Sequence, residues 1–367
     1  QAFIIAAKSG IPALNFLVVD AQGNIGWTIM GPIPRKQGSV GELPSHWANG
    51  NNRWQGYLTP HEYPSIKNPS DNRLWTANSR VVSGQMYNKL GNGGYALGAR
   101  AKQIQQNLFM KSAFDESDLL KIALDDNAVF LNRWQKFMLK AIQHEQDILP
   151  LSDWQEIQNL LTEHPLKASI DSVAYRFIRN FRLNLRDKLF APMTEKLRHL
   201  NPHFDFHIFR HQVEPALWQL ITQQPEVAAY SKSNWQTLFN QILLTTLNDM
   251  TKDQPLAQAT WGQQNTADII HPLSRDIPVL GLWLNMPQKP LAGDHYMPRV
   301  QTPTFGASQR MVVSPGHEED GILHMPSSQS SHPWSPYFNQ GHSDWEQGKN
   351  SAFLPGPTRY TLTLLNY

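Results

Sequence analysis

Two polar residues, Asn78 and Arg100, are of types that could serve hydrolytic chemistry. Asn78 follows the apolar run 74–77, which predicts a short strand because it contains aromatic and β-branched residues and polar residues come next. An amide held at the end of a strand can donate a hydrogen bond to a developing oxyanion, and one such donor stabilises the transition state by roughly 3 kcal/mol. An isolated asparagine after a strand is more often a turn residue. The residues alone leave both interpretations open.

Arg100 falls in the first turns of a helix that the sequence predicts from about Tyr95. Gly91, Gly93 and Gly94 precede it, and such a stretch can form an anion-binding nest. The Gly-x-x-x-x-Gly-Lys-Ser/Thr pattern of a phosphate-binding loop is missing, so the glycines indicate a turn. Without further context Arg100 is an ordinary solvated helix residue.

Four histidines recur at every fourth position: His199, His203, His207 and His211. On one helix this spacing would align imidazoles as metal ligands. Asn201-Pro202 interrupts the helix, however, and no carboxylate completes a recognised motif. We therefore expect no metal site here.

A Ser/His/Asp triad is a second possible catalytic group. Ser330 or Ser335 could combine with His332 and Asp344. No Gly-x-Ser-x-Gly elbow accompanies these residues, so we do not expect a triad.

Composition excludes several classes of protein. The 367 residues suffice for one large or two ordinary domains, and 40% apolar with 17% charged residues is typical of a globular protein. The net charge of +2 implies neither a nucleic-acid partner nor an anionic membrane. Without cysteine there are no disulfides, thiolate metal sites or cysteine nucleophiles. No apolar run approaches the roughly 18 residues that span a bilayer.

Three segments follow from the hydrophobic patterns: a β-rich core part with an active-site loop (1–110), a helical region (111–255), and C-terminal strands and loops that complete the core (256–367). Residues 13–30 predict a hairpin whose first strand is buried on both faces. Residues 306–313 and 321–325 predict neighbouring strands, and 360–365 a last strand. The helical region carries an apolar stripe at every fourth position, which indicates core packing: Val173, Phe177, Phe181, Leu185 and Leu189.

An ordered series of motifs resembles the penicillin acylase family of N-terminal-nucleophile amidohydrolases, over the later two thirds of its β chain. Besides the stretch from 74 to 100, the motifs lie at 14–27, 31–35, 261–262, 293–294, 306–313 and 329–336. Where the family has Gly-Gly-Gln-Ser-Gly, this sequence has Ser327-Ser328-Gln329-Ser330-Ser331. The resemblance implies an α+β fold, the four-layer αββα arrangement of N-terminal-nucleophile hydrolases, present in part and carrying a mainly helical insertion.

The resemblance also implies hydrolysis of a linear amide. The family's nucleophile is a serine that autoproteolysis of a precursor leaves at the start of the β chain, with its own α-amine as base. This chain begins with Gln1, so we expect the nucleophile to lie outside it and the chain alone to be inactive. Asn78 would be the oxyanion donor, Arg100 would orient it, and Leu14 would line the acyl pocket unless it only packs in the core.

Further expectations follow from the same resemblance. Substrates would be β-lactam side-chain amides or N-acyl-homoserine lactones. No cofactor is needed, and the family's calcium is not supported because the region of Asn88 and Lys89 lacks the expected acid. Partners would be the missing N-terminal part of the β chain and the α chain of the same precursor, with neither nucleic acid nor membrane. The protein would be periplasmic or secreted.

Two alternatives remain open. The first is a non-catalytic scaffold or binding remnant of the same fold. The second is a helical partner-binding protein, which rests on residues 115–250 alone and leaves the flanking motifs unexplained.

Overall fold

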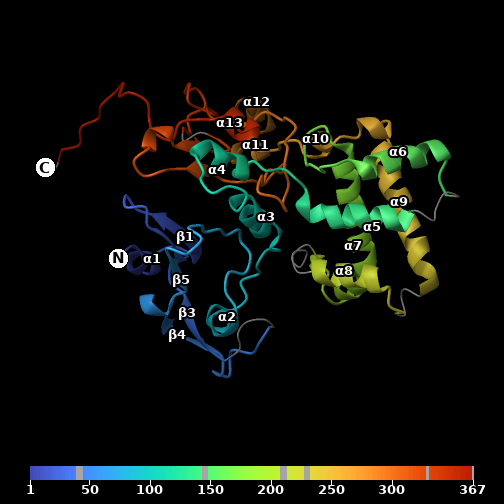
Figure 1. The fold of residues 1–367 in the computed structure, drawn as a ribbon, viewed down its shortest axis with the longest axis horizontal. Helices are drawn as coiled ribbons and strands as arrows, with labels where there is room; N and C mark the ends of the chain where they lie inside the picture. The colour runs from blue at the N-terminus through green and yellow to red at the C-terminus, as the bar shows by residue number, and fades with distance from the viewer. Residues whose placement is uncertain (39–43, 143–147, 207–212, 227–231, 328–329, 366–367) are drawn as a thin grey trace.

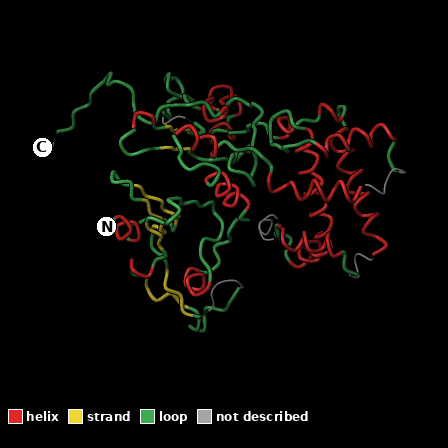
Figure 2. Tube along the Cα trace, in the orientation of Figure 1, coloured by secondary structure: helices red, strands yellow, loops and turns green. Residues whose placement is uncertain are grey.

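The computed structural model describes residues 1–38, 44–142, 148–206, 213–226, 232–327 and 330–365. Strands gather in the N-terminal part and helices in the middle of the chain, while long loops dominate the C-terminal part (Figure 2). In Figure 1 the helices α5 to α9 lie on the side of the molecule away from strands β1 to β5. None of the helices in the described ranges is long and apolar enough to cross a membrane. The proposed division at residues 110 and 255 stays a prediction.

The N-terminal sheet is built on the predicted hairpin. Strand β1 (Leu14–Val19) pairs antiparallel with β2 (Ile25–Met30), so that Leu14 faces Met30 and Val19 faces Ile25. Strand β5 (Ser65–Lys67) pairs with the other side of β2, which gives the order β1-β2-β5. Helix α1 (Ala2–Ala7) packs against β2, and β3 (Pro34–Gln37) pairs with β4 (Arg53–Tyr57) in a second sheet. The structure therefore confirms the hairpin.

The burial predicted for β1 was wrong. Leu14, Leu17 and Val19 are exposed, while Trp27 and Ile29 of β2 are buried. β2 lies at the centre of the sheet and β1 at its edge, and an edge strand has fewer neighbours to cover its side chains. The neighbouring apolar residues of β1 did not distinguish an edge strand from a central one.

Residues 74–77 form no strand, which corrects the other β prediction near the site. An extended segment becomes a strand only when a neighbouring strand accepts its hydrogen bonds, and none pairs with 74–77 in the described chain. Side chains hold this segment instead. Leu74 packs on the core around Trp27, and the Trp75 ring meets the Phe109 ring edge-on at 5.8 Å.

The main core lies among the helices. Around it are α5 (Asn132–Ile142), α6 (Leu151–Thr162), α7 (Val173–Leu200), α8 (Glu214–Gln223) and α9 (Lys232–Thr251). α7 packs against α5, α6 and α9. The predicted stripe at every fourth position is confirmed, since all five of its residues are buried on α7.

Shorter helices connect these parts. They are α2 (Gly84–Leu90), α3 (Ala99–Leu108), α4 (Glu116–Ala123), α10 (Trp261–Gln264), α11 (Pro272–Asp276), α12 (Gly281–Leu284) and α13 (His342–Gln347). Single 3₁₀ turns lie at Pro60–Glu62, Val129–Leu131, Leu256–Gln258, Pro278–Leu280 and Glu318–Asp320.

The C-terminal part confirms one strand pair and corrects another prediction. β6 (Arg310–Val312) and β7 (Ile322–His324) pair antiparallel, as expected for neighbouring strands. Residues 360–365 form no strand and run away from the body of the molecule (Figure 1). Leu362 and Leu364 are exposed there, because no strand of the described chain lies beside this segment.

Candidate active site

The structure brings Asn78 and Arg100 into direct contact. Arg100 Nη2 donates a hydrogen bond to Asn78 Oδ1 at 2.9 Å, and the backbone N–H of Ala96 donates to the backbone carbonyl of Asn78 at 2.9 Å. Asn78 has φ +53°, in the left-handed region that asparagine tolerates better than most residues. Both its backbone and its side chain are thus held in position.

The contact also fixes which way the Asn78 amide faces. Oδ1 accepts from a guanidinium, so the Nδ2 group is turned away from Arg100 and is left to donate elsewhere. Within the described ranges no protein acceptor takes that donor. An amide held in this way can donate to an oxyanion with little reorganisation.

Arg100 owes its place to helix α3. It is the second residue of that helix, which begins after Gly98. Burial lowers the pKa of Arg100, but a guanidinium still remains protonated at neutral pH. The guanidinium therefore acts as a charged donor to Asn78.

A cavity of about 610 Å³ lies at this pair and is called the Asn78 cavity below. Its walls come from Asn78, from residues 93–100 ahead of and within α3, and from residues 295–305. His295 and Phe305 stack in the far wall, with ring centroids 5.7 Å apart. The cavity therefore combines an amide donor and a cation with aromatic and aliphatic surface.

The wall at 295–305 is anchored by Asp294. This buried carboxylate accepts hydrogen bonds from Tyr175 Oη at 2.7 Å, from Arg179 Nε at 2.5 Å and from the His295 N–H at 2.7 Å. Burial would raise the pKa of Asp294, but the Arg179 charge and these donors outweigh it and lower the pKa. Burial and the charge of Asp294 together raise the pKa of Tyr175 well above its usual value. Asp294 is thus an anionic anchor between this wall and α7.

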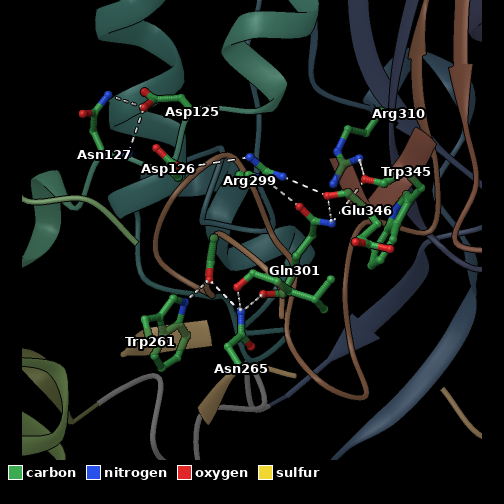
Figure 3. Close-up of polar contacts among 12 residues, drawn as sticks. Asp125, Asp126, Asn127, Trp261, Asn265, Arg299, Gln301, Arg310, Trp345 and Glu346 are labelled. Atoms are coloured by element: carbon green, nitrogen blue, oxygen red, sulfur yellow. Dashed lines mark hydrogen bonds and ion pairs between the residues drawn. The ribbon is translucent and has the colours of Figure 1, made fainter. Parts of the chain in front are cut away.

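A second network fastens the same loops (Figure 3). Buried Asn265 donates through Nδ2 to the carbonyls of Leu291, Gly293 and Gln301, at 2.7, 3.2 and 3.1 Å. Trp261 Nε1 also donates to the Gly293 carbonyl, at 3.0 Å. The sequence motifs at 261–262 and 293–294 therefore act here as scaffolding for the cavity wall.

Leu14 does not join this cavity. It lies in the edge strand β1 and its side chain is 55% exposed. The residues that sequence reasoning missed are His295, Tyr296 and Phe305. The motif at 293–294 pointed to their neighbourhood but not to their role.

The histidine candidate lies partly outside the described residues, and the described part of the chain does not assemble the triad candidate. His199 and His203 are exposed, whereas His207 and His211 lie outside the described residues. His332 Nδ1 accepts from the Trp334 N–H at 3.3 Å, and no hydrogen bond joins this ring to Asp344 in the described ranges. In the same ranges His317, Glu319 and Asp320 lie close to one another, but all three are exposed and such groups are common without an ion.

Comparisons with known proteins identify the family. The family model for penicillin amidase matches residues 2–356. The acyl-homoserine lactone acylase QuiP of Pseudomonas aeruginosa is 24% identical, over 96% of this chain and 46% of that protein. The penicillin acylase 2 proenzyme of Pseudomonas sp. strain SE83 is 24% identical, over 90% and 42%. The chain thus spans less than half the length of these two relatives.

A solved structure matches the fold as well. The thermostable penicillin G acylase from Alcaligenes faecalis aligns with a TM-score of 0.59 and 14% identity, over 99% of this chain and 69% of that one. The chain belongs to the penicillin amidase family and has part of the α+β, four-layer αββα fold of the N-terminal-nucleophile hydrolases.

Proposed function

We propose that this chain supplies the oxyanion-stabilising part of an acylase that hydrolyses a linear amide. The observation that carries the proposal is the hydrogen bond from Arg100 to Asn78, which turns the Asn78 amide donor outward beside a cavity. An oriented donor of this kind suits a tetrahedral intermediate of acyl transfer. A turn asparagine would need no such orientation.

In the proposed reaction an N-terminal serine, supplied by a segment outside this chain, attacks the amide carbonyl. Its α-amine takes the hydroxyl proton and later gives it to the leaving amine. Asn78 Nδ2 donates to the negatively charged oxygen of the tetrahedral intermediate, and Arg100 keeps that donor in place. Water then releases the acid from the acyl-enzyme. These steps use no cofactor.

The substrate class follows from the family. The relatives are named for acyl-homoserine lactones and for penicillin, and substrates of both kinds carry a linear amide. Leu14 lies outside the Asn78 cavity, and its place in an acyl pocket is a proposal that rests on the resemblance to the family. The remaining part of the β chain and the α chain of one autoproteolytic precursor would be the partners, in the periplasm or outside the cell.

The test replaces Asn78 by alanine in the assembled protein, with every polypeptide that copurifies. Loss of an oxyanion donor should lower kcat by roughly a hundredfold or more. Asn72→Ala is the matched control, because Asn72 is also exposed and has φ +52°. Equal turnover in Asn78→Ala and Asn72→Ala would refute the donor role. An assembled protein that cleaves no amide would favour the non-catalytic scaffold.

A further inference from the structure

A second cavity, of about 140 Å³, lies between α7 and the segment 294–297 and is called the arginine cavity below. Three arginines from successive turns of α7 line it: Arg179, Arg182 and Arg186. Arg182 is only 2% exposed and Arg186 only 5%, so their charges are almost fully withdrawn from solvent. Phe130, Leu183 and Met297 are among the apolar residues of its walls.

Guanidinium groups outnumber carboxylates among the residues that line this cavity. Asp294 is the one carboxylate among the described lining residues, against three guanidinium groups. Two more carboxylates bind these arginines from outside the lining. Arg182 Nη2 donates to Glu214 at 2.6 Å, and Arg186 Nη2 lies 2.6 Å from Asp187, which is half-exposed. Glu214 is also shared with Arg133. Each of the three arginines thus has a carboxylate partner, as buried charges require. With Arg133, four guanidinium groups share three carboxylates.

The arginines also keep donors available. Arg182 and Arg186 bind their carboxylates through Nε and Nη2, and Arg179 binds Asp294 through Nε. Throughout the described part of the chain, Nη1 of each of the three forms no hydrogen bond to protein. A guanidinium offers five N–H donors in a fixed fork that matches a carboxylate.

The arginine cavity adjoins the Asn78 cavity. His295 and Tyr296 line both, so these two residues form a shared wall. The Tyr296 ring lies over the Arg182 guanidinium, 5.2 Å from centroid to Cζ, and stacks near Phe130 at 4.6 Å. The lining of the arginine cavity therefore includes both aromatic rings and guanidinium donors.

We propose that the arginine cavity binds the carboxylate of a small organic acid. The arginine donors would hold the carboxylate oxygens, and the apolar walls would cover a ring or a short chain. Inorganic phosphate has no apolar part, so the apolar walls would add nothing to its binding affinity. Binding can be measured without turnover, so the inference stands apart from the proposed function. An acylase does release a carboxylic acid, which gives such a site a place beside the reaction.

The experiment uses isothermal titration calorimetry on the purified full chain with any polypeptides that copurify. The probes are benzoate, its neutral analogue benzamide, and inorganic phosphate. We expect benzoate to bind and Arg186→Gln to weaken it by about tenfold, as loss of a charged hydrogen bond implies. Arg186 is the arginine to replace because its loss leaves only the half-exposed Asp187 without its partner. Arg198→Gln, on an exposed part of the same helix, is the control and should leave binding unchanged.

The results test whether the arginine cavity binds a carboxylate. Partial recovery of benzoate binding in Arg186→Lys, with thermal unfolding like wild type in all variants, would support the site. If Arg186→Gln binds benzoate as tightly as wild type, or if benzamide binds equally well, the arginine cavity is not a carboxylate site. If phosphate binds as tightly as benzoate, the assignment to an organic acid is wrong. If Arg186→Gln loses benzoate binding but keeps amide turnover, the proposed function is unaffected.

Discussion

Replacing Arg100 by methionine should reduce turnover through Asn78 rather than through direct contact with substrate. Methionine keeps a long, flexible side chain but removes the donor that holds Asn78 Oδ1 at 2.9 Å. A hydrogen bond to a charged group contributes about 1.5–3 kcal/mol. If all of it serves to orient the Asn78 donor, kcat should fall by about 10- to 150-fold, since each 1.36 kcal/mol is tenfold in rate.

The assay is steady-state kinetics of the assembled protein on a chromogenic linear amide. We expect kcat to fall and KM to change little, because the oriented donor acts on the transition state more than on the bound amide. Arg100→Lys should recover part of the loss, since an ammonium can still donate to Oδ1. Lys102→Met, on an exposed position of α3, removes a charge without this contact and should retain full activity.

A double mutant tests whether Arg100 acts only by positioning Asn78. If Arg100 acts only through Asn78, then Asn78→Ala combined with Arg100→Met should be no slower than Asn78→Ala alone. Additive losses in the double mutant would show that Arg100 acts independently of Asn78. An Arg100→Met enzyme with wild-type kcat would refute the reasoning entirely.

Two further predictions concern stability. Gly293 has φ +93°, and a Cβ there would lie 2.1 Å from the Arg299 carbonyl, so Gly293→Ala should cost at least about 2 kcal/mol and lower Tm by roughly 4 °C or more. Gly50→Ala is the control, because Gly50 has φ +75° and open space around it, so only backbone strain is added there. An equal loss of Tm in Gly293→Ala and Gly50→Ala would exclude the steric clash. Separately, hydrogen bonds from Arg35 and the Thr59 turn lower the pKa of Glu62 from 4.5 to about 2. The stabilisation by Glu62 is therefore present above about pH 4.5 and is lost as pH falls toward 2, so Glu62→Gln should flatten Tm against pH in that window. An unchanged acid profile in Glu62→Gln would contradict this.

Local pattern predicted much of the fold. The hairpin β1-β2 follows from two β-rich runs around a polar turn, and the buried stripe of α7 follows from a period of four residues. Both signals depend only on neighbours in sequence. The failures depend on distant partners. β1 lies at a sheet edge, and residues 74–77 and 360–365 find no neighbouring strand in the described chain. Their composition favours β structure, but pairing is a tertiary property.

The candidate site was predictable only in part for the same reason. Asn78 and Arg100 were singled out together through an ordered motif series, and the structure places them in contact. The opposite wall comes from His295 and Phe305, which are remote in sequence and carry no pattern of their own. Burial and tertiary contact create that wall, so the motif at 293–294 indicated its neighbourhood but not its role.

The family motifs differ in what they contribute. Trp261 and Asp294 of the motifs, together with nearby Asn265, fasten loops through buried hydrogen bonds, so an enzyme and a non-catalytic remnant of the same fold would both need them. Their presence is therefore evidence for the fold and does not distinguish an enzyme from a remnant. The Asn78 amide differs because its residue lines a cavity and its oxygen is held by Arg100, which leaves the Nδ2 donor turned away from that arginine. A folded scaffold gains little from directing an exposed donor in this way, whereas a developing oxyanion gains a preorganised partner. The orientation of this one amide is therefore the structural feature that favours an acylase over a remnant.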